Sequence, residues 1–501
     1  MKGKSKSWII FIPMLVLLIA VLSYLFTRLS FLYIAHLTPF EHVFSLVYFL
    51  AEAFILFHCF FFFLSVASDN MYREEPKQAE PGKDASVAIL IPARHEPKEI
   101  IEYTLLTCKN IEYENKKVYL LDDSTINKFK QEARELSSSL GVNVFTRDNN
   151  RGAKAGMINE VLKTLTEKYI AIFDADQNPM PLFLNKIIPL LEGNDKLAFV
   201  QTQQFYSNGD FSPVALASQA QQAVFFEYVC QGKSAHDAMF CCGTNVVFRR
   251  SALEDVGGFA EDSITEDLAT SVKLHLKHWK SMYCNKAYTF GMAPEDLESY
   301  FKQQSRWAMG SIGLFRRVIR LFFTDMKALT AIQWIEYTLA TTWYFIGWAY
   351  FFMVAGPIMY ILFNVHSFLL DPWLIVLTWL PYFFLSMLLF YSSMSKKKYP
   401  LSTMFKVQVL NMLTIPILMR AAILGVLNIK KGFQVTPKGV GTSVPYTELW
   451  QQLLLLGVNF AALLWGLFRL SNENDILLSV DVFWVFFHSI LFSGIFYFNK
   501  K

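Results

Sequence analysis

The chain has 501 residues, of which 53% are hydrophobic and 16% are aromatic. That composition is too apolar for a soluble enzyme of this length and indicates a membrane protein. The net charge of +4 is too small to indicate nucleic-acid binding, and no basic and aromatic surface pattern accompanies it. The six cysteines show no C-x-x-C spacing, so we expect reduced thiols rather than disulfides.

Long apolar segments flank a central region of mixed composition. Residues 8–26 and 42–66 are nearly free of charge, and each is long enough to cross a bilayer as a helix. The first segment is long for a cleaved signal peptide and has no small-x-small cleavage site, so we expect a retained anchor. Residues 87–307 have the composition of an ordinary α/β protein, and apolar segments return after Met309.

The distribution of lysine and arginine predicts a multi-pass protein of the cytoplasmic membrane, with the large soluble domain and both chain ends in the cytoplasm. A crossing by residues 407–427 would place Lys430, Lys431 and Lys438 outside, so we predict an interfacial helix there. Arg316, Arg317 and Arg320 alternate with apolar residues, which predicts a second interfacial helix. The six predicted spans are 8–26, 42–66, 332–361, 369–392, 447–469 and 476–497.

These patterns divide the chain into six units. They are two transmembrane helices in 1–70, a cytoplasmic domain in 71–308, an amphipathic interfacial helix in 309–330, two transmembrane helices in 331–393, an interfacial helix and a loop in 394–446, and two transmembrane helices in 447–501. Within the soluble domain, strand and helix patterns alternate as β, α, β, α, β, α, β and β. This order predicts an α/β domain with a mostly parallel, Rossmann-like sheet. No G-x-G-x-x-G follows the first strand, so no nicotinamide or flavin cofactor is indicated.

The stretch Tyr169 to Pro179 is typical of a buried strand that ends in acids. Its apolar residues up to Phe173 fit a strand covered on both faces, and Asp174 and Asp176 follow at once. Ligands of parallel sheets bind at the carboxyl edge, where two such aspartates can hold Mg²⁺ or Mn²⁺ together with substrate phosphates. A solvated strand-end turn is the alternative interpretation of these residues alone.

Other polar residues follow the same logic, each with a structural alternative. Asp122 and Asp123 end a second strand, where a carboxylate can accept hydrogen bonds from a ribose or a base. Lys154 lies near a helix start between glycines and suits a diphosphate, although a solvated lysine is the simpler reading. Further on, Thr265-Glu266-Asp267 could be an N-cap with first-turn acids. The pair Arg306-Trp307 could be an interfacial anchor.

The order of these motifs resembles the processive family 2 glycosyltransferases, the membrane β-glycan synthases that include bacterial cellulose synthase. The resemblance runs from about Val87 to Trp307. It rests on Asp123, Asp174-x-Asp176, Thr265-Glu266-Asp267, Gln303-x-x-Arg306-Trp307, Gln201-Thr202-Gln203 and the segment FCCGTNVVFRR at 240–250. The segment Phe433 to Gly439 is similar to the F-x-V-T-x-K-G gating loop of cellulose synthase and related glucan synthases.

The resemblance implies a GT-A glycosyltransferase domain and a role for each matching residue. Asp267 would be the general base, and Glu266 would shape the same site. Asp174 and Asp176 would hold the metal, and Cys242, Gly243 and Trp307 would line the acceptor channel. The residues implied to bind the nucleotide sugar are Asp123, Lys154, Asp174, Thr265, Gln303, Arg306, Trp307, Phe433, Thr436 and Lys438.

The implied activity is the synthesis of a β-linked glucan, cellulose-like, from UDP-glucose, with export of the growing polysaccharide through the spans. The partners implied are the UDP-sugar donor, the polysaccharide acceptor, the lipid bilayer and accessory export or regulatory subunits. The same machine using a UDP-N-acetylhexosamine is the alternative. A transporter or scaffold that has lost catalysis is a remote alternative, because the candidate metal pair and base are intact. No C-terminal cyclic-dinucleotide-binding domain follows Gly439, so we expect direct control by that nucleotide to be absent.

Overall fold

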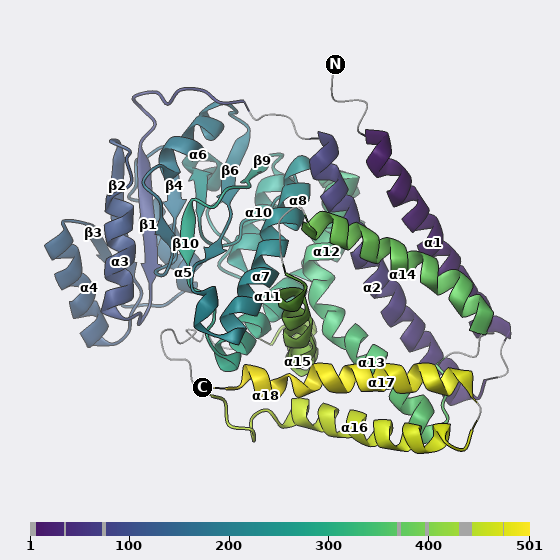
Figure 1. Ribbon diagram of the computed structural model, residues 1–501. Helices are drawn as coiled ribbons and strands as arrows, with labels where there is room; N and C mark the ends of the chain where they lie inside the picture. The colour runs from purple at the N-terminus through teal and green to yellow at the C-terminus, as the bar shows by residue number, and fades with distance from the viewer. Residues whose placement is uncertain are drawn as a thin grey trace.

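The computed structural model describes residues 7–34, 37–72, 77–367, 372–395, 400–429, 443–473 and 475–500. An α/β domain forms one side of the molecule, and long helices form the other (Figure 1). Helices from the middle of the chain lie between the two parts (Figure 1).

A seven-stranded sheet is the centre of the α/β domain. Its strand order is β3-β2-β1-β4-β8-β6-β9, and β8 runs antiparallel to both of its neighbours while the other pairs are parallel. The strands are β1 Val87–Ala93, β2 Lys116–Asp122, β3 Asn143–Thr146, β4 Tyr169–Ile172, β6 Leu197–Thr202, β8 Val246–Arg249 and β9 Lys280–Cys284. A second small sheet contains β5 Asn178–Pro179, β10 Thr289–Gly291 and β7 Phe205–Tyr206.

Helices cover both faces of the large sheet, because its strands are apolar on both sides. In β1, Val87, Ile89 and Ile91 point into one core, and Ala88 and Leu90 point into the other. The first core is closed by α3 Lys98–Lys109, α4 Asn127–Leu140 and α6 Phe183–Glu192. The second is closed mainly by α5 Ala153–Leu162 and α9 Arg250–Asp255. Burial on both faces is the usual environment of a parallel sheet.

The predicted α/β sheet is confirmed, and two features were not predicted. The five strands expected from sequence form β1, β2, β3, β4 and β6. The antiparallel β8 and the small sheet were missed, because both are assembled from short segments whose partners lie far away in the chain. Residue Thr289 of β10, for example, pairs with Pro179 of β5.

Six helical segments among the described residues are long and apolar enough to cross a membrane. They are Ile12–Ile34, Pro39–Val66, Ala331–Phe363, Leu401–Val426, Trp450–Leu470 and Ile476–Phe498. Five of them coincide with predicted spans. The sixth is α15 Leu401–Val426, for which we predicted an interfacial helix. The predicted span at 369–392 forms α14 Pro372–Ser395. The described apolar part of this helix, Val376–Phe390, is shorter than each of the six candidate spans.

Helix α15 lies against helices that belong to the α/β domain. These are α7 Pro213–Val224 and α11 Leu297–Thr324, which join the domain to the membrane helices. The Gln221 amide of α7 donates to the Asn411 side chain of α15 at 2.9 Å. This packing supports an interfacial α15, while its length and composition also fit a span. Its assignment stays a prediction.

Helix α11 is longer than the sequence pattern indicated. The predicted interfacial segment 310–323 is its second half, and Gln303, Arg306 and Trp307 lie in its first half. The predicted boundary between residues 308 and 309 therefore falls inside one continuous helix. The motif residues are consequently fixed to the segment expected at the membrane surface.

The remaining membrane helices are arranged as hairpins. They are α1 Ser7–Ile34 with α2 Pro39–Tyr72, α12 Ala331–Thr342 continuing into α13 Ile346–Phe363, and α16 Trp450–Leu470 with α17 Ile476–Ser493 and α18 Ile495–Phe498. Figure 1 shows the hairpin turns of α1–α2 and α16–α17 on the side away from the α/β domain, where α13 also ends. Contacts join these ends, since His366 Nδ1 lies 3.1 Å from Glu41 Oε1.

Candidate active site

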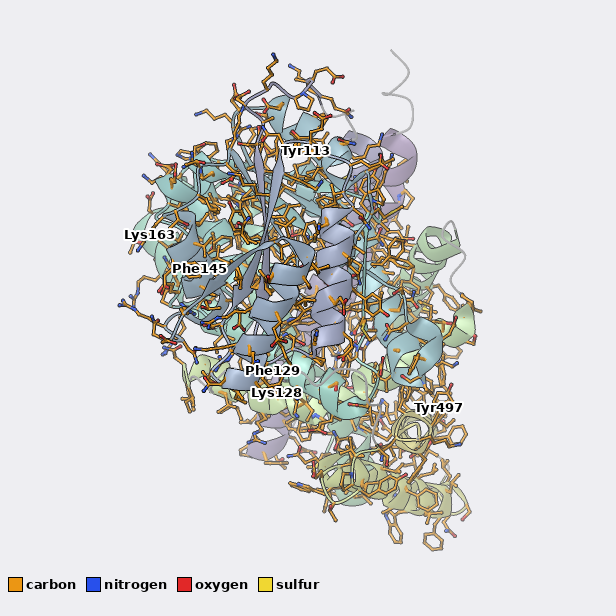
Figure 2. All side chains as sticks on the ribbon, turned by 90° about the vertical axis from the view of Figure 1, so that its left-hand side faces the viewer. Tyr113, Lys128, Phe129, Phe145, Lys163 and Tyr497 are labelled. Carbon is orange, nitrogen blue, oxygen red and sulfur yellow. The ribbon has the colours of Figure 1, made fainter. Side chains whose placement is uncertain are left out.

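The predicted site residues gather where the strands of the large sheet end. Tyr113 precedes β2, and Lys128 and Phe129 follow it in α4. Figure 2 shows Tyr113 near the top and Lys128 with Phe129 near the bottom, on the side where Tyr497 of α18 lies. The carboxyl edge of the sheet therefore faces the helices that lead to the membrane. Asp123 directly follows β2 at this edge, and Asp174 follows β4 after one residue.

Asp123 is buried and forms a two-point ion pair with Arg147. Arg147 Nε donates to Asp123 Oδ1 at 2.6 Å, and Nη2 donates to Oδ2 at 3.1 Å. Asp123 is 5% exposed and Arg147 is 6% exposed. The neighbouring Asp122 accepts from the Ser124 backbone N–H at 3.1 Å, so it shapes the turn after β2.

Lys154 lies at the centre of the acidic groups. Its Nζ donates to Asp174 Oδ1 at 2.5 Å and to the Gly243 carbonyl at 2.6 Å. Burial would lower the pKa of Lys154, but Asp174, Glu266 and Asp267 more than offset this effect and raise it. The ammonium therefore stays charged, and it stands in the crevice where three separate segments of the chain meet.

The Asp174 and Asp176 pair fits the chemistry of a hard divalent cation. The two residues are one position apart at the strand end, and carboxylate oxygens are preferred ligands of Mg²⁺ and Mn²⁺. Within the described ranges, no group of three or more His, Cys, Asp or Glu side chains stands ready to hold a metal. A cation bound here would take its other ligands from water and from substrate phosphates, as Mg²⁺ commonly does.

Glu266 and Asp267 begin α10 Glu266–Leu276 and face Lys154. Burial and the adjacent Glu266 carboxylate raise the pKa of Asp267 to about 7. Two groups oppose this rise, because the Leu268 N–H donates to Asp267 Oδ1 at 2.8 Å and Lys154 adds a positive charge. Burial also raises the pKa of Glu266, while Lys154 lowers it. A carboxylate with a pKa near 7 can take a proton efficiently at neutral pH.

Thr265 occupies the N-cap position of α10, but its side chain makes no capping hydrogen bond. The alternative interpretation of the motif as a side-chain cap is therefore wrong for Thr265. Instead, its methyl carbon packs against α11, because a Cβ added at Gly310 would lie only 2.3 Å from it. Thr265 thus sets how closely α11 approaches the start of α10.

Tyr206 connects the α11 motif to the aspartate pair. Its hydroxyl is hydrogen-bonded to Gln303, and the charges of Asp176, Arg306 and Asp174 act on its pKa. Burial raises the pKa of Tyr206, which is 2% exposed, so the phenol stays neutral. Arg306 also acts on Glu266, whose pKa it lowers. The interfacial-anchor interpretation of Arg306 is therefore insufficient, since its charge reaches the crevice.

The segment before β8 forms one wall of the site. The Cys242 N–H donates to Gln201 Oε1 at 2.8 Å, and the Gln201 amide donates to the Thr244 carbonyl at 2.7 Å. The Asp174 N–H donates to Thr244 Oγ1 at 2.8 Å. Gly243 has φ +84, and a Cβ there would meet Asp267 Oδ2 at 3.0 Å. Only glycine allows the backbone to adopt this conformation so close to the carboxylate.

The structure brings together Lys154, Asp174, Asp176, Cys242, Gly243, Thr265, Glu266, Asp267, Gln303 and Arg306 at the sheet edge, and Asp123 is linked to them through Arg147. Trp307 follows Arg306 on α11, and its acceptor role stays a prediction. The predicted gating-loop residues Phe433, Thr436 and Lys438 lie outside the described residues. Sequence reasoning missed Arg147 and Tyr206, and it included Thr244 only as part of the segment at 240–250, with no role of its own. Neither Arg147 nor Tyr206 stands in a strand-end acid pair or a helix start, so only their three-dimensional contacts identify them.

Two family models match the chain. The model described as "Glycosyltransferase like family 2" matches residues 84–310, and the model described as "Cellulose synthase" matches residues 254–398. The cellulose synthase catalytic subunit of Pseudomonas fluorescens is 28% identical over 437 residues, which is 83% of this chain and 57% of that protein. The cellulose synthase 1 catalytic subunit of Komagataeibacter xylinus is 28% identical over 341 residues, which is 67% of this chain and 45% of that protein. The chain is similar to the cellulose synthase-like family 2 glycosyltransferases.

This glycosyltransferase chain spans about half the length of the curated relatives it matches. Its fold is also that of a solved mannosyltransferase from Pyrobaculum calidifontis, in complex with GDP-Man and Mn²⁺. The TM-score is 0.55 at 16% identity, over 77% of this chain and 100% of that chain. The likeness confirms the predicted GT-A-like domain. Together with the six candidate spans, the family makes this glycosyltransferase a multi-pass membrane protein.

Proposed function

We propose that this glycosyltransferase is a processive, inverting enzyme that polymerises a β-linked glucan from UDP-glucose and moves the product across the cytoplasmic membrane. The observation that carries the proposal is the cluster at the sheet edge. Lys154 contacts Asp174 at 2.5 Å, and both of these residues act electrostatically on the α10 carboxylates. The relatives are described as UDP-forming cellulose synthase subunits, which supports UDP-glucose as the donor.

Asp267 serves as the general base. A sugar hydroxyl is a poor nucleophile at neutral pH, and a carboxylate with a raised pKa can accept its proton as the new bond forms. Glu266 keeps that pKa high because its charge lies next to Asp267. Attack from the side opposite the leaving group converts an α-linked donor into a β-linkage. A second carboxylate is not required for this single displacement.

Lys154 and Arg306 stabilise the negative charge that develops on the departing UDP. Both are cations beside the strand-end carboxylates, and such pre-positioned charges stabilise a transition state at low reorganisation cost. A Mg²⁺ or Mn²⁺ held by Asp174 and Asp176 supplies further positive charge to the diphosphate. Asp123 binds the nucleoside end, at the end of β2, which β1 separates from β4.

Trp307 supplies the acceptor site. It follows Arg306 on α11, the helix that continues from the motif residues into the segment expected at the membrane surface. An indole face packs well against a sugar ring. Cys242 and Gly243 line the path that the polymer takes from this site. The catalytic domain and both chain ends lie in the cytoplasm, as the basic residues indicate.

The donor sugar is tested by incubating the purified protein in lipid with radiolabelled UDP-glucose or UDP-N-acetylglucosamine and a divalent cation. We expect polymer only from UDP-glucose, and complete digestion of that polymer by a β-glucan-specific hydrolase. Incorporation only from the N-acetylhexosamine donor would contradict the glucan assignment while leaving the synthase assignment in place. Omission of the cation with a chelator present should abolish incorporation.

A further inference from the structure

Arg147 is a buried arginine that follows β3 directly, and it uses every N–H of its guanidinium. An arginine side chain has five N–H donors. Two donate to Asp123, as described above, and a third, from Nη1, donates to Glu160 Oε1 at 3.2 Å. The other two donate to backbone carbonyls, from Nη1 to Arg151 at 2.9 Å and from Nη2 to Ala153 at 2.7 Å. The side chain is 3% exposed.

The backbone that Arg147 holds leads straight to Lys154. Gly152 has φ +69 and Ala153 has φ +46, so the chain passes through two left-handed residues just before the lysine. An alanine disfavours that conformation, and it persists where surrounding contacts enforce it. Gly156 makes room for the turn, since a Cβ there would lie 2.0 Å from the Arg151 carbonyl and 3.2 Å from Arg147 Nη1.

One side chain therefore fixes two separate parts of the crevice. On one side it orients both oxygens of Asp123 at the end of β2. On the other it holds the turn that aims Lys154 at Asp174 and the Gly243 carbonyl. Asp123 and Lys154 are separated by 31 positions in the chain, and the Arg147 side chain bonds both to Asp123 and to the turn before Lys154.

We propose that Arg147 is a positioning residue that couples the nucleoside end of the donor site to its diphosphate end. This inference rests on the proposed function, which makes Asp123 the nucleoside ligand and Lys154 the diphosphate ligand. Arg147 orients both carboxylate oxygens of Asp123, and it holds the turn before Lys154 at a fixed position relative to Asp123. The nucleotide is thus recognised as one rigid unit.

Lysine cannot replace this arginine. A lysine ammonium has three donors and no planar fork, so it cannot bond to both Asp123 oxygens and two carbonyls at once. Arg147→Lys should keep the positive charge but lose the geometry of the guanidinium hydrogen bonds. Arg147→Gln removes both. Neither change touches Asp267 or Trp307, so the base and the acceptor site should remain intact.

The test measures UDP binding by calorimetry in the presence of Mg²⁺, together with KM for UDP-glucose and kcat, on the full-length protein in lipid nanodiscs. We expect Arg147→Gln to weaken UDP binding and raise KM by about tenfold or more, as the loss of charge-assisted bonds implies, and to lower kcat as well, because the released turn carries Lys154, which stabilises the departing UDP. Arg147→Lys should recover only part of the affinity. Arg134→Gln is the matched control, because it removes an exposed arginine of α4 in the same domain and should change neither constant.

A double-variant cycle separates positioning from a merely structural role. If Arg147 acts through Asp123, then Asp123→Asn should lower UDP affinity in the wild type and change it little in the Arg147→Gln background. Thermal unfolding and gel filtration identify folded variants, and if Arg147→Gln is unfolded the same cycle is run with Arg147→Lys.

Multiplicative effects of the two substitutions, or wild-type UDP affinity in both folded Arg147 variants, would overturn the inference. A wild-type protein that binds no UDP would instead contradict the proposed function itself.

Discussion

The acid–base behaviour of Asp267 is set by its neighbours. An isolated aspartate is ionised well below neutral pH and is a weak base there. Burial at the start of α10 and the Glu266 carboxylate raise its pKa to about 7, against the opposing effect of Lys154. The same crevice also raises the pKa of Lys154. The site therefore holds a base that can change protonation near neutral pH beside a cation that does not.

Asp267→Asn should abolish polymer synthesis while UDP binding is retained. The amide keeps the shape of the side chain but cannot accept the acceptor proton, so we expect a loss in kcat of at least about a hundredfold. Radiolabelled incorporation measures the activity, and calorimetry measures UDP binding. Asp262→Asn is the control, since Asp262 is an exposed residue close by whose carboxylate lies 3.5 Å from Arg317. Substantial activity in Asp267→Asn would assign the base to another group.

The pH profile should report the pKa of Asp267. The base acts only when ionised, so kcat/KM should rise with pH through about 7 and then level off. Glu266→Gln removes a charge that raises this pKa, so the acidic limb of the profile should move to lower pH, whatever the change in absolute rate. Glu261→Gln removes a carboxylate that instead contacts Asn159 and should leave the limb in place. An unmoved limb in Glu266→Gln would show that another group controls the profile.

Residues in local patterns could be predicted from the sequence, and residues that act through distant contacts could not. Asp174, Asp176, Glu266 and Asp267 stand at strand ends or a helix start, where the backbone alone brings them to one edge. Arg147 reaches Asp123 across 24 positions. Thr265 matched a capping pattern, yet its side chain packs on α11, because the approach of that helix decides its orientation.

Helix α11 connects the candidate active site to the membrane helices. Its first half carries Gln303, Arg306 and Trp307, and its second half packs against α10 and α12 through Leu314 and Val318. Gly310 stands between these halves, where Thr265 of the α10 N-cap fits against the helix backbone. The position of the base relative to the acceptor site therefore depends on one close contact between two helices.

Gly310→Ala should impair catalysis more than nucleotide binding. The new Cβ would lie 2.3 Å from the Thr265 methyl carbon, so the start of α10 must shift. Displacements of this size at a catalytic group can cost up to about a hundredfold in rate, so we expect a kcat lowered by about tenfold or more with little change in UDP affinity. Gly313→Ala on the same helix is the control, because its Cβ meets only the Gly425 carbonyl at 3.9 Å. Equal effects of the two substitutions would remove Thr265 from this role.

Helices and strands with a regular spacing of apolar residues could be predicted from the sequence. The elements that each of them packs against or pairs with were harder to predict. The buried strands and α10 follow from apolar runs and amphipathic spacing. The antiparallel β8 does not, because strand direction depends on the long path through α7 and α8 Gln231–Ala235 that returns the chain to the sheet. Helix α15 has the length and hydropathy of a span although charge placement predicts an interfacial helix, because hydropathy alone does not register the packing of α15 on α7 and α11.

The whole molecule places the candidate active site at one end of a helical bundle and the hairpin turns at the other. The carboxyl edge of the sheet faces α7, α11 and α15, and the turns of α1–α2 and α16–α17 lie on the far side (Figure 1). Under the proposed function, a polymer made at this edge would have the membrane helices directly behind it, which would account for catalytic and membrane segments sharing one chain.

The membrane topology yields the last prediction, which concerns three engineered cysteines. If α15 is interfacial and α14 crosses, then Ser402→Cys and Asn428→Cys lie in the cytoplasm, and Ser471→Cys lies outside. A membrane-impermeant thiol reagent added to intact cells should label only Ser471→Cys above the wild-type background, and permeabilised cells should show labelling of all three. The exposed turn after α16 favours reaction at Ser471. External labelling of Ser402→Cys with protection of Asn428→Cys would instead mean that α15 crosses in place of α14. External labelling of Asn428→Cys with protection of Ser471→Cys would mean that both helices cross, which would reverse the orientation of α16 and α17.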